Sequence, residues 1–180
     1  MNDLTLSKSR LLAGATIVFL IVISLSGAAG AQEGETLPLA ETGPYSVGIR
    51  EMTFVDSSRD DLKLDVVIWY PAEEAGESTP SDLSGAPYPL VFYVRGGQLS
   101  RPMDMAYLNA HLASHGFIVA AANHPWPDTP EFAVHRPLDI LFLIDQLTLE
   151  APDELAGMSD PELVGVAGYS LGGVTALQMA

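Results

Sequence analysis

Runs of apolar residues divide the chain into segments with the lengths of strands. Three runs, at 90–94, 117–122 and 163–167, are almost continuously apolar and are bounded by glycine or polar residues, which is typical of parallel strands buried on both faces. Two earlier segments, 45–55 and 62–70, carry alternating apolar residues and flank a polar turn. This pattern predicts an antiparallel hairpin at the edge of a sheet.

Helical spacing of apolar residues appears between and after the three apolar runs. It predicts helices over 103–115, with Gly116 as the C-terminal cap, over 137–149, with Pro137 in the first turn, and over 174–180. The positions expected to face the core are Met105, Leu108 and Leu112 in the first helix and Leu141, Ile144 and Leu147 in the second. Strands and helices that alternate in this way predict an α/β fold, a mostly parallel sheet with helices on both faces. Active sites of such sheets lie at the carboxyl ends of the strands.

A candidate nucleophile lies where the last apolar run meets the last helix. The residues there are Gly168, Tyr169, Ser170, Leu171 and Gly172. This G-x-S-x-G spacing between a strand and a helix predicts a nucleophile elbow, because a sharp turn needs small residues two positions before and after the serine. The following helix directs its N-terminal N–H groups towards the serine oxygen. A glycine-rich turn without chemistry is the alternative, and a nucleotide-binding loop fits less well, since no lysine follows the glycines.

The composition of the chain limits the kinds of partner and site that we expect. The chain has 23 acidic and 8 basic residues and a net charge of −15, so we expect a solvated acidic surface and no nucleic-acid partner. The absence of cysteine excludes disulfides, thiolate metal sites and a cysteine nucleophile. The histidine spacing suggests no metal site.

The N-terminus has the layout of a secretory signal peptide. Lys8 and Arg10 precede an apolar run at 11–25, and small residues follow at 29–31. We expect cleavage after residue 31 and an extracytoplasmic protein, secreted or periplasmic. An uncleaved membrane anchor is the alternative, and only then is the membrane a partner.

The remaining chain divides into a linker and one domain. Residues 32–43 are small, acidic and rich in proline and glycine, which is typical of a linker. Residues 44–180 form the predicted domain.

Several segments resemble the α/β-hydrolase superfamily. They lie at 43–48, 67–72, 122–125, 136–140 and 145–147, and the elbow at 168–172 completes the set. They are most similar to the branch that contains platelet-activating factor acetylhydrolases and predicted dienelactone hydrolases. Dienelactone hydrolases proper use a cysteine nucleophile, so the serine of this elbow favours the esterase side.

The resemblance implies a carboxylic ester hydrolase that works through an acyl-enzyme on Ser170. The backbone N–H groups of Leu171 and Gly97 are then the oxyanion-hole donors. Arg95 departs from the family, which usually has His-Gly in this loop. The substrate would be a small ester or lipid, and no cofactor is expected.

Two residues of the loop after the run at 117–122 are weaker candidates for the substrate pocket. They are His124, which follows a strand end, and Trp126, which lies between two prolines. For Trp126, packing of the loop is an equally good interpretation. His111, His115 and His135 are expected at helix surfaces, helix ends or loops.

The acid and the histidine of a serine triad follow the serine in this family. Residues 171–180 contain neither, so we expect both partners to come from sequence beyond Ala180, with this chain a C-terminally truncated hydrolase domain. The alternative is an inactive fragment, or a non-catalytic binding protein that uses a hydrolase scaffold.

Overall fold

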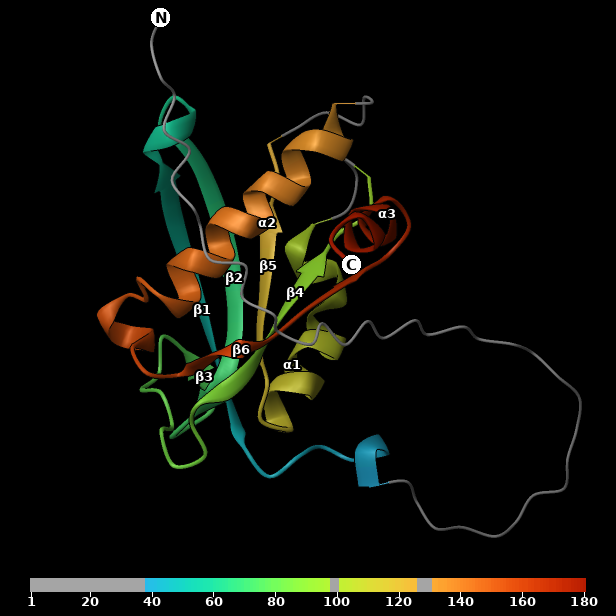
Figure 1. The fold of residues 1–180 in the computed structure, drawn as a ribbon. Coiled ribbons are helices and arrows are strands. Elements are labelled where there is room, and N and C mark those ends of the chain that lie inside the picture. The colour runs from blue at the N-terminus through green and yellow to red at the C-terminus, as the bar shows by residue number, and fades with distance from the viewer. Residues whose placement is uncertain (1–37, 98–100, 126–130) are drawn as a thin grey trace, which may run out of the picture.

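The computed structural model describes residues 38–97, 101–125 and 131–180, which form a mixed six-stranded sheet with helices on both faces (Figure 1). The strands are β1 (Ser46–Asp56), β2 (Leu62–Ala72), β3 (Gly76–Glu77), β4 (Tyr88–Val94), β5 (Ile118–Asn123) and β6 (Ser159–Gly168). The α-helices are α1 (Ala106–Ser114), α2 (Phe132–Thr148) and α3 (Leu171–Gln178). Four short 3-10 helices are η1 (Pro38–Ala40), η2 (Ser57–Arg59), η3 (Pro102–Met105) and η4 (Asp153–Leu155). The predicted α/β fold class is confirmed.

The strand order is β3-β1-β2-β5-β4-β6. β1 and β2 form the predicted antiparallel hairpin, paired from Ser46 opposite Ala72 to Asp56 opposite Leu62. The three apolar runs become β4, β5 and β6, and β4 pairs in parallel with both of the others. The carboxyl ends of β4, β5 and β6 therefore lie together at the same end of these parallel strands. The hairpin does not form the outermost edge, because the short β3 pairs with β1.

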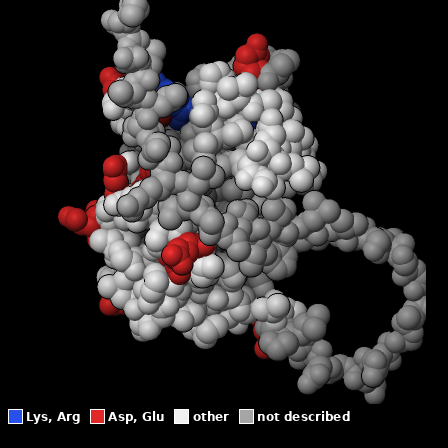
Figure 2. Space-filling model, viewed as in Figure 1, with Lys and Arg blue, Asp and Glu red and all other residues white. Residues whose placement is uncertain are grey.

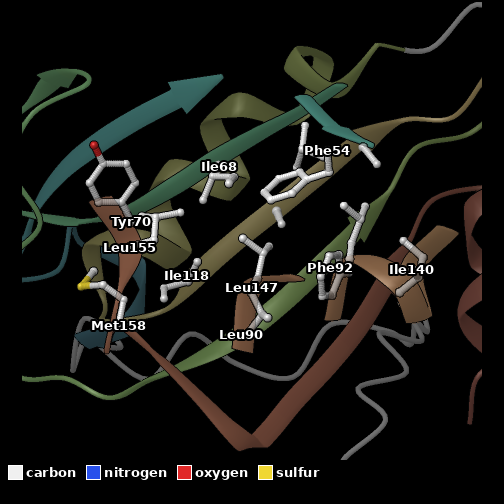
Figure 3. Close-up of a cluster of buried hydrophobic side chains, with 14 of the residues drawn as sticks. Phe54, Ile68, Tyr70, Leu90, Phe92, Ile118, Ile140, Leu147, Leu155 and Met158 are labelled. Atoms are coloured by element: carbon white, nitrogen blue, oxygen red, sulfur yellow. The ribbon is translucent and has the colours of Figure 1, made fainter. Parts of the chain in front are cut away.

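The larger part of the core lies between the sheet and α2, which crosses one face of the sheet in Figure 1. Side chains from several strands converge there with Ile140 and Leu147 of α2, as Figure 3 shows. Successive residues of a strand point to opposite faces, so Ile68 of β2 belongs to this cluster while Trp69 belongs to the cluster beneath α1. For β4 and β5, burial on both faces agrees with the continuous apolar runs. For β6 that prediction was wrong: it is the edge strand, and Leu163 is 48% exposed.

Helix α1 covers the opposite face, where Ala113 packs with Val119 of β5. The helix ends at the predicted cap: Gly116 has a φ of +86° and its N–H donates to the Ala113 carbonyl at 3.0 Å. Glycine adopts this left-handed conformation without a steric penalty. The chain can thus turn directly from α1 into β5.

Helix α2 differs from the prediction at its start and on one face. It begins at Phe132, so Pro137 lies inside the helix rather than in its first turn. Proline cannot donate to the carbonyl four residues earlier, but the N–H groups of Val134 and His135 donate to the Glu131 carbonyl at the start of the helix. Leu141 is 52% exposed and does not face the core. The buried positions of this helix include Ile140, Leu143 and Leu147.

Residues 38–43, the described part of the predicted linker, lie against α1. His111 Nε2 lies 2.7 Å from the Leu39 carbonyl oxygen and His115 Nε2 lies 2.9 Å from that of Glu41. The two imidazole rings meet edge to face. These histidines have the helix-surface and helix-end positions that the sequence predicts. The predicted signal peptide, residues 1–31, lies outside the described residues, and export stays a prediction.

The surface seen in Figure 2 carries separate acidic patches and only a small basic area. No helix in the described ranges has the length and apolar character needed to cross a membrane.

The two leucines Leu141 and Leu147 provide a test of how α2 packs. We expect Leu147→Ala to lower the free energy of unfolding by about 2–5 kcal/mol, because Leu147 is 1% exposed and its removal leaves a cavity in the core. Leu141→Ala, the matched control on the exposed face, should change it by about 0.5 kcal/mol or less. Urea unfolding followed by circular dichroism measures both, and equal losses would contradict this packing.

Candidate active site

Ser170 lies at the turn between β6 and α3 with a backbone conformation that is unusual for a serine. Its φ is 54° and its ψ is −119°, and the residue is exposed. Non-glycine residues rarely adopt a positive φ. Such strain persists where the surroundings fix the backbone, and it is common at active sites. The predicted strand–turn–helix context of the serine is present.

The two glycines of the motif explain how the turn closes. A Cβ built on Gly168 would lie 2.3 Å from the carbonyl carbon of Gly172, and one built on Gly172 would lie 2.0 Å from the Val94 carbonyl oxygen. Both distances are far below van der Waals contact. The turn therefore requires glycine at each position, for the reason that the sequence pattern suggested.

The same close approach brings the turn against the end of β4. The Tyr169 N–H donates to the Val94 carbonyl at 3.2 Å, and the N–H of Gly173 donates to the Ser170 carbonyl at 2.9 Å. Leu171 is the first residue of α3, and the first N–H groups of a helix have no carbonyl partner within it. The Leu171 N–H is thus available beside the serine, and the loop after β4 is its neighbour.

The side chain of Arg95 holds that loop, residues 95–97, by hydrogen bonds. Its side chain is buried, with Nη1 donating to the Gly97 carbonyl at 2.8 Å and Nη2 donating to the His124 carbonyl at 2.9 Å. One guanidinium thus ties the loop after β4 to the loop after β5.

A second guanidinium binds the same loop. Arg136 of α2 is fully buried, and its Nη1 lies 3.1 Å from the Gly96 carbonyl oxygen and 3.4 Å from that of Arg95. The guanidinium also lies 5.5 Å from the centre of the Phe132 ring, a cation–π distance. Carbonyl groups of the loop therefore accept hydrogen bonds from two cations.

His124 forms a buried pair with Asp139 of α2. Its Nδ1 lies 2.8 Å from Asp139 Oδ2, and neither side chain is exposed. Arg59 of the hairpin turn binds the other carboxylate oxygen at 2.7 Å and Asp56 at 2.6 Å. Because a carboxylate only accepts hydrogen bonds, Nδ1 of His124 carries the proton.

Burial sets the charge of this histidine. Desolvation lowers the pKa of His124, the Asp139 carboxylate raises it, and the nearby Arg136 and Arg95 lower it again, so that the pKa falls below its ordinary value. The imidazole is therefore neutral at pH 7. The negative charge of the Asp139 carboxylate is balanced instead by Arg59, which donates to its other oxygen.

The structure brings together part of the predicted site. The turn at Ser170 and the loop that holds Gly97 lie side by side, as the packing of Gly172 against Val94 shows. No hydrogen bond links the Ser170 side chain to His124 or to any other histidine within the described ranges. The pocket-lining role of His124 stays a prediction, and Trp126 lies outside the described residues.

The sequence analysis did not assign roles to Arg136, Asp139 and Arg59. A signal for the first two was present: they are three residues apart on the face of α2 that also carries Ile140 and Leu143. Charged residues on an otherwise apolar helix face are buried only when they are paired. Their partners, however, come from distant parts of the chain, which a single sequence does not reveal.

Comparison with known proteins identifies the fold. No protein-family model matches this chain, and no curated protein matches it by sequence. Among the solved structures that match is a ferulic acid esterase from Streptomyces cinnamoneus, with a TM-score of 0.64 and 23% sequence identity. The alignment covers 75% of this chain and 55% of the esterase, so the chain spans about half of that protein's length.

The likeness shows that the chain shares the α/β fold of this esterase over the aligned region. It does not support the more specific resemblance to the branch of platelet-activating factor acetylhydrolases and dienelactone hydrolases, which stays a prediction from the sequence segments.

The glycines of the turn allow a matched test. We expect Gly172→Ala to destabilise the protein and to displace the turn, because the added Cβ meets the Val94 carbonyl. Gly165→Ala in β6 is the control, since nothing lies within 4 Å of a Cβ built there. Thermal unfolding compares the two variants. A Gly172→Ala protein as stable as Gly165→Ala would contradict the close packing of the turn.

The buried histidine predicts a pH dependence of stability. Because the pKa of His124 is lower in the folded protein, the unfolded chain binds more protons once the pH falls below about 6.5. The free energy of unfolding should therefore fall between pH 7.5 and pH 5.5. We expect His124→Asn, whose amide N–H replaces the Nδ1 donor, to reduce this fall in urea-unfolding experiments. An unchanged pH slope in the variant would contradict the assignment.

Proposed function

We propose that the protein containing this chain is a serine hydrolase that cleaves carboxylic esters, with Ser170 as the nucleophile. The observation that carries this proposal is the strained backbone of Ser170 between a strand and a helix. The serine lies beside the loop at 95–97, whose peptide groups are held by hydrogen bonds. The esterase fold of the structural neighbour is consistent with it. Backbone strain of this kind is concentrated at active sites.

In the proposed reaction Ser170 Oγ attacks the ester carbonyl carbon and loses its proton to a general base. The N–H groups of Leu171 and Gly97 stabilise the resulting oxyanion, each worth roughly a hundred- to a thousandfold in rate. The tetrahedral intermediate collapses, the C–O bond to the alcohol breaks, and the alcohol leaves with the proton. Water then hydrolyses the acyl-serine by the same steps and releases the acid.

The general base in this proposal is a histidine oriented by an acid, as the resemblance to α/β-hydrolases implies. His124 is a poor base for Ser170, because its ring is buried and no hydrogen bond joins it to the exposed serine within the described residues. Its carbonyl instead accepts a hydrogen bond from Arg95 of the loop after β4.

The proposed substrate is a small ester or a lipid ester. A feruloyl ester is the first natural type to test, since the structural neighbour is a ferulic acid esterase. p-Nitrophenyl acetate, a small activated ester, serves as a general probe.

A non-catalytic binding protein on the same scaffold is the second candidate. It is favoured by the absence of any bond between Ser170 and a histidine across the described part of the chain, and by Arg95 in the place of the family's histidine. Chemical labelling of the serine separates the two candidates, because a scaffold without a working base does not activate its hydroxyl.

We therefore expect a fluorophosphonate probe to label the full-length protein at Ser170, because the probe reacts with an activated serine and places its oxygen in the oxyanion hole. Ser170→Ala should abolish labelling and lower p-nitrophenyl acetate hydrolysis at least about a thousandfold. Ser84→Ala, an exposed serine of a surface loop, is the control and should label at the wild-type rate. Peptide mass spectrometry locates the adduct, and a wild-type protein that is not labelled would favour the binding protein.

A further inference from the structure

The loop that carries Gly97 has both of the peptide groups around this glycine held by arginine. Arg136 Nη1 bonds the Gly96 carbonyl at 3.1 Å, and Arg95 Nη1 bonds the Gly97 carbonyl at 2.8 Å. These two carbonyls belong to the peptide planes before and after the Gly97 Cα. Together these two hydrogen bonds restrain the φ and ψ of that residue.

This restraint matters because glycine has the widest conformational freedom of all residues. In a trans peptide the C=O of one residue and the N–H of the next point in opposite directions. Since the Gly96 carbonyl points to the buried Arg136, the Gly97 N–H points away from it. An unrestrained glycine would distribute this N–H over many directions.

We propose that Arg95 and Arg136 are positioning residues that aim the Gly97 N–H at the oxyanion. This inference rests on the proposed function and extends it to two side chains that need not touch the substrate. Arg136 orients the donor peptide group itself. Arg95 fixes the next peptide group and anchors it to the His124 carbonyl at the end of β5.

The chemistry of arginine suits this task. Its planar guanidinium presents several donors in a rigid fork, so one Arg95 side chain can bond two carbonyls that lie in different loops. Lysine offers a single ammonium centre and histidine at most two ring N–H groups. A cation on the Gly96 carbonyl also polarises its peptide group, which strengthens the N–H as a donor.

The buried pair of His124 and Asp139 supports the clamp. The His124 ring is held by Asp139, and Asp139 by Arg59, so the carbonyl that receives Arg95 belongs to a residue whose side chain is fixed. Arg95 therefore binds the loop to a rigid support.

The test uses the full-length protein and the variants Arg95→Met and Arg95→Lys. We expect Arg95→Met to lower kcat for p-nitrophenyl acetate and the rate of fluorophosphonate labelling about ten- to a hundredfold, because a misplaced donor loses oxyanion stabilisation. KM should change less than about twofold, since the ground-state ester does not depend on this donor. Arg95→Lys retains the charge and should keep an intermediate kcat.

Chemical rescue separates positioning from general damage. In Arg95→Ala, millimolar guanidinium ion should raise the labelling rate at Ser170 at least about fivefold by occupying the vacated space. Arg50→Met is the matched control, because Arg50 also donates to a backbone carbonyl, that of Ser78, but on β1. It should label at the wild-type rate and show no rescue.

Labelling of Arg95→Met and Arg95→Lys at the wild-type rate, with the wild type labelled at Ser170, would overturn the clamp and leave the proposed function standing. Should Arg95→Met fail to fold, Arg95→Lys and the rescue experiment decide the matter: a folded Arg95→Lys with unchanged kcat, or no guanidinium effect, overturns it. A wild type that is not labelled at all would overturn both proposals.

Discussion

The contact between Gly172 and the Val94 carbonyl is the constraint on which the candidate site depends. It places the first turn of α3 directly on the end of β4, at a distance that excludes any side chain. The chain leaving β6 must therefore reverse within a few residues. Ser170 takes up this reversal with its positive φ, so the exposed hydroxyl is a consequence of the close packing of backbone on backbone.

A second constraint is the burial of charged and polar side chains beneath the loop after β4. Arg95, Arg136, Asp139 and His124 all have little or no exposed surface. Buried charges are costly unless they are paired and hydrogen-bonded. Here the guanidinium groups bind loop carbonyls and the carboxylate binds a guanidinium and an imidazole. These hydrogen bonds offset the cost of burying the groups. They also fix the geometry of the loop next to the serine.

The fold was largely predictable, because β4 and β5 are buried on both faces and appear as continuous apolar runs. The run of β6 also predicted a strand, although that strand lies at the edge of the sheet and is only partly buried. The turn at Ser170 was predictable for a local reason, since its geometry is decided by residues two positions away. The start of α2 was not, because Pro137 is a typical first-turn residue, whereas the helix begins at Phe132. Leu141 shows the same limit. The apolar spacing predicted its helix, but the buried side chain is that of Ile140, one residue earlier.

The polar network beneath the loop could not be predicted from spacing. Arg59 and Asp139 are 80 positions apart in the chain, and their ion pair exists because β1 and β2 lead the hairpin turn to α2. Periodicity describes one element at a time and carries no information on which charged residues of separate elements meet.

The ion pairs of Arg59 have a practical consequence for engineering. The tip of a hairpin is usually a tolerant place to insert an epitope or a fluorophore. Here Arg59 of the turn bonds Asp56 and the buried Asp139, and through His124 and Arg95 that bond reaches the loop of Gly97. An insertion beside Arg59 would thus disturb a segment that looks remote from it, and the exposed loop around Ser84 is the better attachment point.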